Sequence, residues 1–387
     1  MLFLALQSAP QNGKRPVLLA ARNAHKALLY AAALLDFDIR WLWPSAQAEG
    51  ALCSCPVTAE ALTGALHALA QQGIEPFGVY VTSPDYLGGV QDIPALAAVC
   101  RAQGVPLLVD NAHGAYLRFL PQNCHPIAQG AAMCCDSAHK TLPVVTGGAY
   151  LHLAHDAPVQ DEAAVRGALA LFGSTSPSYL ILQSLDACNA VLAGDYPRRL
   201  AQCCAALEGL RRSLNKAAAA RQCPVPLAVA GAQQEPMKLT LDAAALGCTG
   251  TALAEALRRA QLECEYADPR YVVLMFTPEN PPQDFERLQT ALEQLLAAVP
   301  AGLSRPENRA GEFAALQQQA AQRCTIRQAV LGAQVRIPVH KTLGRVCAMP
   351  TVSCPPAIPV AVSGEEITPA AIALMQRYGI EKLSVLR

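Results

Sequence analysis

The sequence of 387 residues has no excess of charge of either sign. Its 30 Lys and Arg side chains balance 30 Asp and Glu side chains, so the formal net charge is zero. A nucleic-acid or anionic-membrane partner requires a basic surplus, and the balance therefore excludes both as main partners. Charged residues make up only 16% and hydrophobic residues 52%. This composition excludes disorder and predicts a large buried core.

Long apolar runs are also missing. No uncharged apolar stretch reaches the roughly 18 residues that span a bilayer, so no membrane-spanning segment is expected. The opening residues, Met1 to Leu6, lack the basic start of a secretory signal peptide. The length predicts two to three domains at roughly 150 residues each.

Several motifs are absent. There is no GxxxxGK[ST] or GxGxxG phosphate loop and no HExxH or CxxC metal or redox motif. The 15 cysteines therefore indicate small buried side chains in a reducing cytosol rather than disulfides. No metal site is expected, because the spacing typical of zinc sites is missing from the loose Cys/His group of Cys124, His125, Cys134, Cys135 and His139.

Short apolar runs alternate with amphipathic stretches over the first 155 or so residues. Strands alternating with helices predict an α/β fold with a mainly parallel sheet covered on both faces. Helical patterns occupy 59–72 and 93–103. The predicted strands are 16–20, 39–43, 77–82, 106–110, 131–136 and 149–153.

Three units are predicted along the chain: a major domain over 1–218, a small α/β domain over 219–300 and a C-terminal domain over 301–387. The first ends in a helical region from 161, interrupted by Gly and Pro at 173–177. The second holds strand patterns at 236–241, 262–266 and 271–276. Its apolar stripe at helical spacing predicts core positions at Phe285, Leu288, Leu292 and Leu295.

Two predicted strands end in residues that can do chemistry. The run 106–109 ends in Asp110, and the run 133–135 leads through Asp136 to Lys140. Ligands gather at the carboxyl ends of parallel strands, so both side chains can face one ligand. A lysine that forms a Schiff base and a carboxylate that keeps a pyridine nitrogen protonated suit pyridoxal phosphate. The alternatives are a turn-forming Asp and a solvated loop lysine.

A third strand end carries a histidine. The run 16–20 leads to His25, whose flat imidazole can stack on a pyridine ring. The alternative is a histidine that only begins a helix.

At this point the sequence resembles the ornithine/lysine/arginine decarboxylases, which are fold type I pyridoxal-phosphate enzymes. The resemblance covers nearly the whole chain, and its SxHK and DxAHG strings are specific together. It lies in the segments RNAHK (22–26), TSPDYLG (82–88), LVDNAHGA (108–115), SAHKTLP (137–143), STSPSY (174–179) and PPAIP (355–359).

The resemblance implies a role for each matching position. Lys140 would bind the cofactor aldehyde, with Asp110 on the pyridine nitrogen and His25 stacked on the ring. His139 would lie beside the phosphate or the reacting carbon, and Ser137 would contact the phosphate. The remaining implied contacts are Ala112 and His113 on the cofactor face, and Ser174 on the phosphate of a partner subunit.

Departures from the family pattern are equally informative. Family members usually carry about a hundred more residues at the start, including a phosphate-binding loop. The first nine residues resemble the helix after that loop, so a fragment is expected, the alternative being a protein that has lost its main phosphate anchor. Asn111 stands where the family usually has a Glu beside the cofactor Asp. A Glu is also common in the family near position 349, where this chain has Met349. Cys354 begins a segment that is usually Tyr-Pro-Pro-Gly in the family.

The sequence therefore predicts a cytoplasmic lyase that decarboxylates arginine, lysine or ornithine with pyridoxal 5'-phosphate, as in polyamine metabolism. It is expected to act as a homodimer with shared active sites. Two alternatives stay open: another reaction of the same cofactor, such as aminotransfer, and a catalytically silent subunit that pairs with an active homologue.

Overall fold

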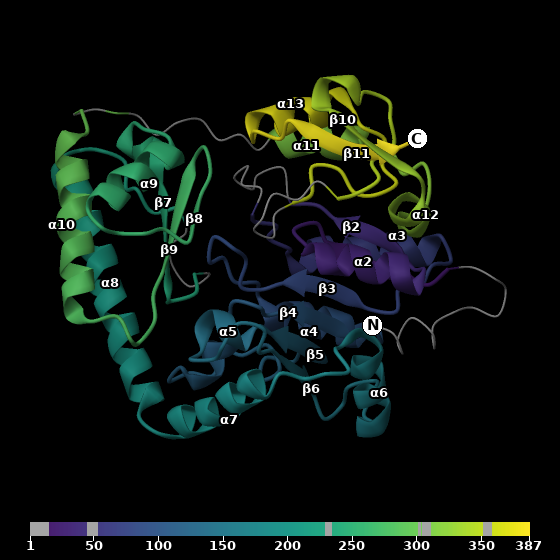
Figure 1. Ribbon diagram of the computed structural model, residues 1–387, viewed down its shortest axis with the longest axis horizontal. Helices are drawn as coiled ribbons and strands as arrows, with labels where there is room; N and C mark the ends of the chain where they lie inside the picture. The colour runs from purple at the N-terminus through teal and green to yellow at the C-terminus, as the bar shows by residue number, and fades with distance from the viewer. Residues whose placement is uncertain (1–14, 45–52, 229–233, 301–302, 304–310, 351–357) are drawn as a thin grey trace.

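The computed structural model describes residues 15–44, 53–228, 234–300, 303, 311–350 and 358–387. Within them the chain is an α/β structure with a six-stranded, a three-stranded and a two-stranded sheet (Figure 1). The predicted fold class, a mainly parallel sheet followed by smaller units, is confirmed. The helix predicted over the first nine residues lies outside the described residues.

The large sheet has the strand order β2-β1-β3-β4-β5-β6. All neighbours pair in parallel except β5 and β6, which run antiparallel. The expectation of parallel pairing is wrong for β6, because the connection from β5 holds only the short helix α5, Ala138–Thr141, and cannot cross the sheet. The strands are β1 Val17–Ala21, β2 Asp38–Leu42, β3 Val79–Thr82, β4 Leu107–Asp110, β5 Met133–Asp136 and β6 Tyr150–Leu153.

Both faces of this sheet are covered, as the side-chain alternation of β1 shows. Leu18 and Ala20 belong to one buried cluster with Leu29 of the helix α2. Leu19, on the other face, belongs to a second cluster with Leu62 of α3. A strand buried on both faces shows the continuous apolar run from which it was predicted. The helices are α2 Lys26–Leu35, α3 Ala59–Gln71 and α4 Ile93–Ala102, followed after β4 by the 3-10 helix η1 Ala115–Phe119.

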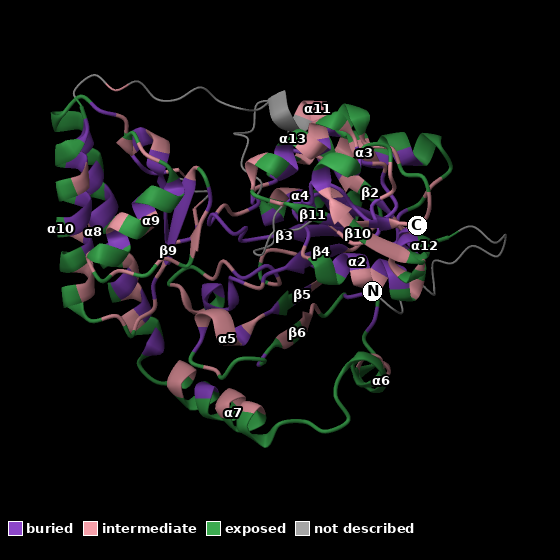
Figure 2. Cartoon of the chain, turned by 45° about the horizontal axis from the view of Figure 1, so that its top comes forward, coloured by how far each residue is buried: buried purple, intermediate pink, exposed green. Residues whose placement is uncertain are grey.

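The predicted helical region after residue 161 forms three helices. These are α6 Glu162–Phe172, α7 Tyr179–Ala193 and α8 Tyr196–Ala220. The break at 173–177 is confirmed, and a second break at Gly194 was not predicted. Helix α6 has no buried residue and α7 only Cys188. Figure 2 shows both helices largely exposed, with α6 standing away from the body of the chain.

The second unit packs helices against an antiparallel sheet of order β7-β9-β8. Leu288 and Leu292 of its last helix are buried, while Phe285 and Leu295 are half-buried against the same cluster. Of the predicted strand 262–266 only Tyr266 lies in a strand, because Leu262 closes the turn after α9 with its backbone N–H on the Leu257 carbonyl. The elements are β7 Lys238–Asp242, η3 Ala243–Leu246, α9 Gly250–Arg259, β8 Tyr266–Ala267, β9 Tyr271–Met275 and α10 Pro282–Ala298.

The C-terminal unit lies over the β2 side of the large sheet, with α12 against α2 (Figure 1). Its strands β10 and β11 pair antiparallel. The boundaries proposed at 218 and 300 stay predictions. No helix among the described residues is both long and apolar enough to cross a bilayer. The elements are α11 Gly311–Gln319, α12 Ile326–Leu331, β10 Gln334–Pro338, η4 Val339–Lys341, α13 Pro369–Arg377 and β11 Lys382–Leu386.

Candidate active site

Asp110 ends the buried strand β4 and is itself only 8% exposed. The Tyr80 hydroxyl on β3 donates to its Oδ2 at 2.8 Å, and the Ala112 backbone N–H donates to Oδ1 at 3.1 Å. Burial, together with the Asp110 charge, raises the pKa of Tyr80 well above its ordinary value, so the phenol stays a donor. An ionised carboxylate has lone pairs beyond these two, which leaves room for a donor on a ligand.

Lys140 lies on α5, just after β5, and its Nζ is 3.3 Å from His113 Nε2. His113 is 3% exposed. Burial, and next the positive charges of Lys238 and Lys140, hold the pKa of His113 well below its ordinary value. The imidazole is therefore neutral, and its Nε2 can accept a hydrogen bond from the lysine.

His25 follows β1 and caps α2, because its Nδ1 accepts the Ala27 backbone N–H at 3.2 Å. Burial lowers the pKa of His25; Asp110 opposes the shift and Lys140 adds to it. The structure brings His25, Asp110 and Lys140 to one edge of the sheet, with Ala112 and His113 beside them.

Three other residues singled out by the sequence lie less directly at this edge. His139 Nδ1 is 2.8 Å from the Gly148 carbonyl oxygen, which fixes the ring. Ser137 precedes α5 at the N-cap position, and its hydroxyl makes no capping hydrogen bond. Ser174 is exposed between α6 and α7 and pairs with Ser176 in its own loop.

Sequence reasoning missed Tyr86 of the first unit and two residues that the second unit contributes, Glu265 and Lys238. Tyr86 packs edge to face on His113, with ring centroids 5.0 Å apart, and donates to Glu265 at 2.5 Å. Lys238 of β7 is 1% exposed and donates to the Asp85 carbonyl at 3.0 Å. A charged residue within the predicted strand 236–241 was the one available signal for Lys238. Tyr80 gave no signal, because a tyrosine is ordinary in a strand.

The residues present fit the ring of pyridoxal phosphate. Among the described residues, His113 Nδ1 and both side-chain polar atoms of Asn23 are buried without a hydrogen-bond partner. Buried polar atoms normally have partners, so a polar ligand at this edge would satisfy what the protein does not. The Asp110 carboxylate and the Lys140 amine are the groups that such a ring requires, and the His25 imidazole can stack on it.

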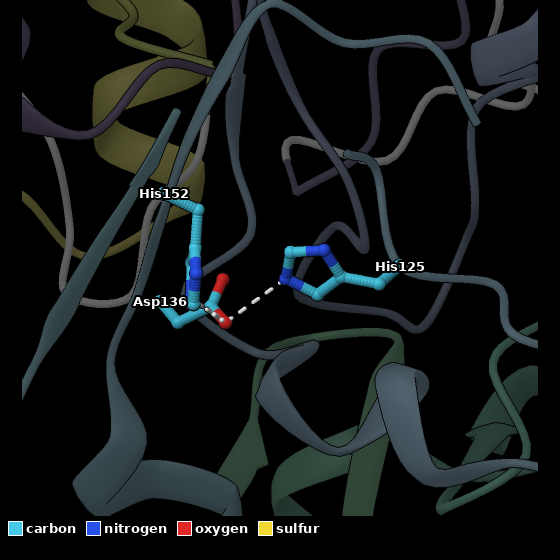
Figure 3. Close-up of side chains that lie close together, drawn as sticks. All are labelled: His125, Asp136 and His152. Carbon is cyan, nitrogen blue, oxygen red and sulfur yellow. Dashed lines mark hydrogen bonds and ion pairs between the residues drawn. The ribbon is translucent and has the colours of Figure 1, made fainter. Parts of the chain in front are cut away.

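The fold brings together a different set of metal-ligand side chains from the loose Cys/His group considered in the sequence. His125 lies with Asp136 of β5 and His152 of β6, and both imidazoles point at the same carboxylate (Figure 3). Cys134 Sγ is 3.7 Å from His125 Nε2. The sequence did not suggest His152, since only the antiparallel return of β6 brings it to β5.

Residues 6–233 match the family model described as "Orn/Lys/Arg decarboxylase, major domain". The chain is 27% identical over 358 residues to an arginine decarboxylase of Bacillus subtilis, covering 90% of this chain and 70% of that protein. It is 30% identical over 265 residues to the uncharacterized protein YaaO of Bacillus subtilis, covering 67% of this chain. The match spans only 52% of the length of YaaO.

Solved structures share the fold. The constitutive lysine decarboxylase of Escherichia coli superposes with a TM-score of 0.73 at 18% identity, covering 100% of this chain and 68% of that one. The lysine decarboxylase LdcF of Francisella novicida gives a TM-score of 0.76 at 17% identity, with the same coverage.

Proposed function

The chain belongs to the Orn/Lys/Arg decarboxylase family, and on that premise we propose that it decarboxylates a basic amino acid with pyridoxal 5'-phosphate. Relatives named arginine and lysine decarboxylase support the reaction class. The observation that carries the proposal is the meeting of Asp110, Lys140 and His25 at one sheet edge. When bound there, the cofactor supplies an aldehyde that bonds amines and a ring that accepts an electron pair.

The Asp110 carboxyl group lies at the end of β4. The Tyr80 hydroxyl and the Ala112 N–H fix its two oxygens, so the carboxylate cannot rotate freely. A carboxylate held in this way stabilises a proton on a pyridine nitrogen, which strengthens the ring as an electron acceptor. We assign Asp110 this role and Tyr80 the positioning of Asp110.

Lys140 needs a free amine to bond an aldehyde, and an ammonium is not a nucleophile. Neutral His113, 3.3 Å away, can accept a hydrogen bond from Lys140 Nζ at its Nε2 and so hold the amine in place. The lowered pKa of His113 keeps this imidazole neutral, so it places no second positive charge beside the lysine. Tyr86 packs against the ring and keeps it in this position.

The other positions keep the roles that the family implies, as proposals. His25 stacks on the ring from the start of α2, and Ala112 packs on the cofactor face. His139, anchored to the Gly148 carbonyl, presents its free ring edge beside the phosphate or the reacting carbon. The uncommitted Ser137 hydroxyl contacts the phosphate.

The site departs from the family pattern at Asn111. Its amide donates to Asp136 Oδ1 at 2.7 Å, and the residue is fully buried. The amide oxygen of Asn111 is buried without a hydrogen-bond partner, and a neutral amide has no charge to pair with a basic substrate group as a carboxylate would. Arginine, lysine and ornithine are therefore all to be assayed.

The test is to add pyridoxal phosphate to the purified chain. A saturable yellow absorbance band is expected, and borohydride should fix the cofactor to Lys140, as read by peptide mass spectrometry. Lys140→Ala should abolish both the band and carbon dioxide release. Lys216→Ala, at an exposed lysine of α8, is the matched control and should keep both.

Each alternative gives its own result. A keto acid in place of an amine product would indicate aminotransfer. The absence of a saturable band would support a silent subunit. A Lys140→Ala protein that released carbon dioxide at the parent rate would refute the assignment of Lys140.

A homodimer with shared sites is the assembly that we propose. Large apolar side chains are exposed around Ser174: Leu171 at 71%, Phe172 at 57% and Leu180 at 73%. Apolar surface of this kind marks protein contacts. Mixing Lys140→Ala with Ser174→Ala chains should restore activity that neither has alone, because a mixed dimer has one intact site. Light scattering that finds only a monomer would contradict the assembly.

A further inference from the structure

Two imidazoles converge on one carboxylate oxygen on the face of β5 and β6 away from the Asp110 carboxylate. His125 Nε2 is 3.1 Å and His152 Nε2 is 3.0 Å from Asp136 Oδ2 (Figure 3). The ligand atoms of the three residues all lie within 4.8 Å of one another. Side chains alternate along a strand, so Asp136 faces away from the side on which its neighbour Cys135 approaches Asp110.

The spacing suits a small metal ion. An ion with tetrahedral bonds of about 2.0–2.1 Å keeps its ligand atoms about 3.3 Å apart. The observed separations from Asp136 Oδ2 to the two imidazole nitrogens are only a few tenths of an ångström shorter. The ligand atoms of the two imidazoles also lie within 4.8 Å of each other, so side-chain rotations would have to bring all three atoms to the separation that the ion requires. The Ile127 backbone N–H donates to His125 Nδ1 at 3.4 Å, which is the outer limit of a hydrogen bond. This weak contact does little to prevent rotation of the His125 side chain.

The cluster is rigid on one side and open on the other. Asn111 donates to Asp136 Oδ1 at 2.7 Å, which leaves Oδ2 turned toward the imidazoles. The side chain of His152 is 37% exposed, and that of Asp136 only 3%. All three residues line a groove of about 600 Å³ shared with Phe119, Tyr150 and Asn189. An ion could enter from this groove and keep an open position toward it.

The donor set selects the kind of ion. Imidazole nitrogen suits zinc, copper, iron and nickel, whereas magnesium and calcium require oxygen ligands. Two histidines and one carboxylate are a ligand set of zinc enzymes that keep a fourth position open. We propose that His125, Asp136 and His152 form a binding site for a divalent transition-metal ion, of which Zn²⁺ is the expected one.

The test uses the full chain after chelator treatment. Titration with Zn²⁺ by calorimetry is expected to show one equivalent bound per chain, and Co²⁺ should give the visible bands of a tetrahedral site, which Zn²⁺ then removes. His152→Ala should weaken binding more than about 100-fold, because even the loss of an outer-shell partner costs 10–100-fold. Binding should also weaken as the pH falls, since the ion displaces the imidazole protons.

His67→Ala, at an exposed histidine of α3, is the matched control and should bind as the parent does. Asp136→Asn is a second variant, with circular dichroism checking that each protein is folded. Equal Zn²⁺ affinity in His152→Ala and His67→Ala would overturn the proposal, as would a parent chain that binds no Zn²⁺. Either result would mean that the two imidazoles serve only as hydrogen-bond partners of Asp136 and bind no metal ion.

Discussion

The hydroxyl of Tyr80 lies 2.8 Å from Asp110 Oδ2, and both residues are buried on the same side of adjacent parallel strands. Tyr80 pairs with Leu108, two residues before Asp110, so the tyrosine side chain reaches along the face toward the end of β4. The carboxylate assigned to the cofactor therefore has its position set by a neighbouring strand as well as by its own turn.

Removing this hydroxyl tests the positioning of Asp110. Tyr80→Phe leaves the ring packing intact but withdraws a donor from a buried carboxylate. Hydrogen bonds to charged groups contribute about 1.5–3 kcal/mol, so the free energy of unfolding should fall by that order in urea titrations. The affinity for pyridoxal phosphate should fall as well. Tyr179→Phe, at a tyrosine that is 82% exposed, should change neither quantity.

The neutral state of His113 predicts a pH dependence. Its folded pKa lies well below the ordinary value because of burial, so below about pH 6.5 the unfolded chain binds a proton that the folded chain does not. Stability therefore falls as the pH falls. Between about pH 7.5 and 5.5 the parent should lose about 1.4 kcal/mol more than His113→Gln.

Urea unfolding of both proteins without cofactor measures this difference. His25, whose pKa is also lowered by burial, contributes to the slope of both proteins and does not affect the comparison. Equal slopes in the two proteins would contradict a neutral His113.

The main strands and the core of the site were predictable because their signals are local. An apolar run that ends in a polar residue predicts a strand and its carboxyl end, and this located Asp110 and the approach to Lys140. Helical spacing in the same way located the buried Leu288 and Leu292.

Contacts made through pairing were not predictable from a single sequence. Tyr80 reaches Asp110 through the register of β3 and β4, and His152 reaches Asp136 through the antiparallel return of β6. Lys238 reaches Asp85 only because the second unit packs on the first. In each case the partners are far apart along the chain, and no spacing rule connects them.

Glu235 predicts a pH effect of the opposite sign. Burial raises its pKa to about 7, and it is 1% exposed. Between the ordinary value of about 4.3 and 7, the folded chain holds a proton that the unfolded chain releases, so stability falls as the pH rises. From about pH 5 to 8 the parent should lose about 2.5 kcal/mol relative to Glu235→Gln. Urea unfolding at both pH values tests this, and a parent that gained stability relative to the variant would refute it.

A buried ion pair joins the large sheet to the C-terminal unit. Arg22 Nη1 and Nη2 donate to the two oxygens of Glu365 at 2.7 and 2.8 Å, and Arg22 is fully buried. Glu365→Gln leaves this guanidinium without its counter-charge, so the free energy of unfolding should fall by about 3–5 kcal/mol. Glu162→Gln is the control, because its pair with Arg166 is exposed and should contribute only about 0.3–0.5 kcal/mol.

The double variant Arg22→Met with Glu365→Leu separates charge from packing. The Arg22 guanidinium lies 4.9 and 4.4 Å from the ring centroids of Trp41 and Trp43, and a methionine can fill that space. Replacing a buried pair with apolar groups is often neutral, so the double variant should unfold at a higher urea concentration than Glu365→Gln alone. If it is instead the less stable of the two, the pair contributes more than its desolvation costs, and the ionic contact itself holds the C-terminal unit on the sheet.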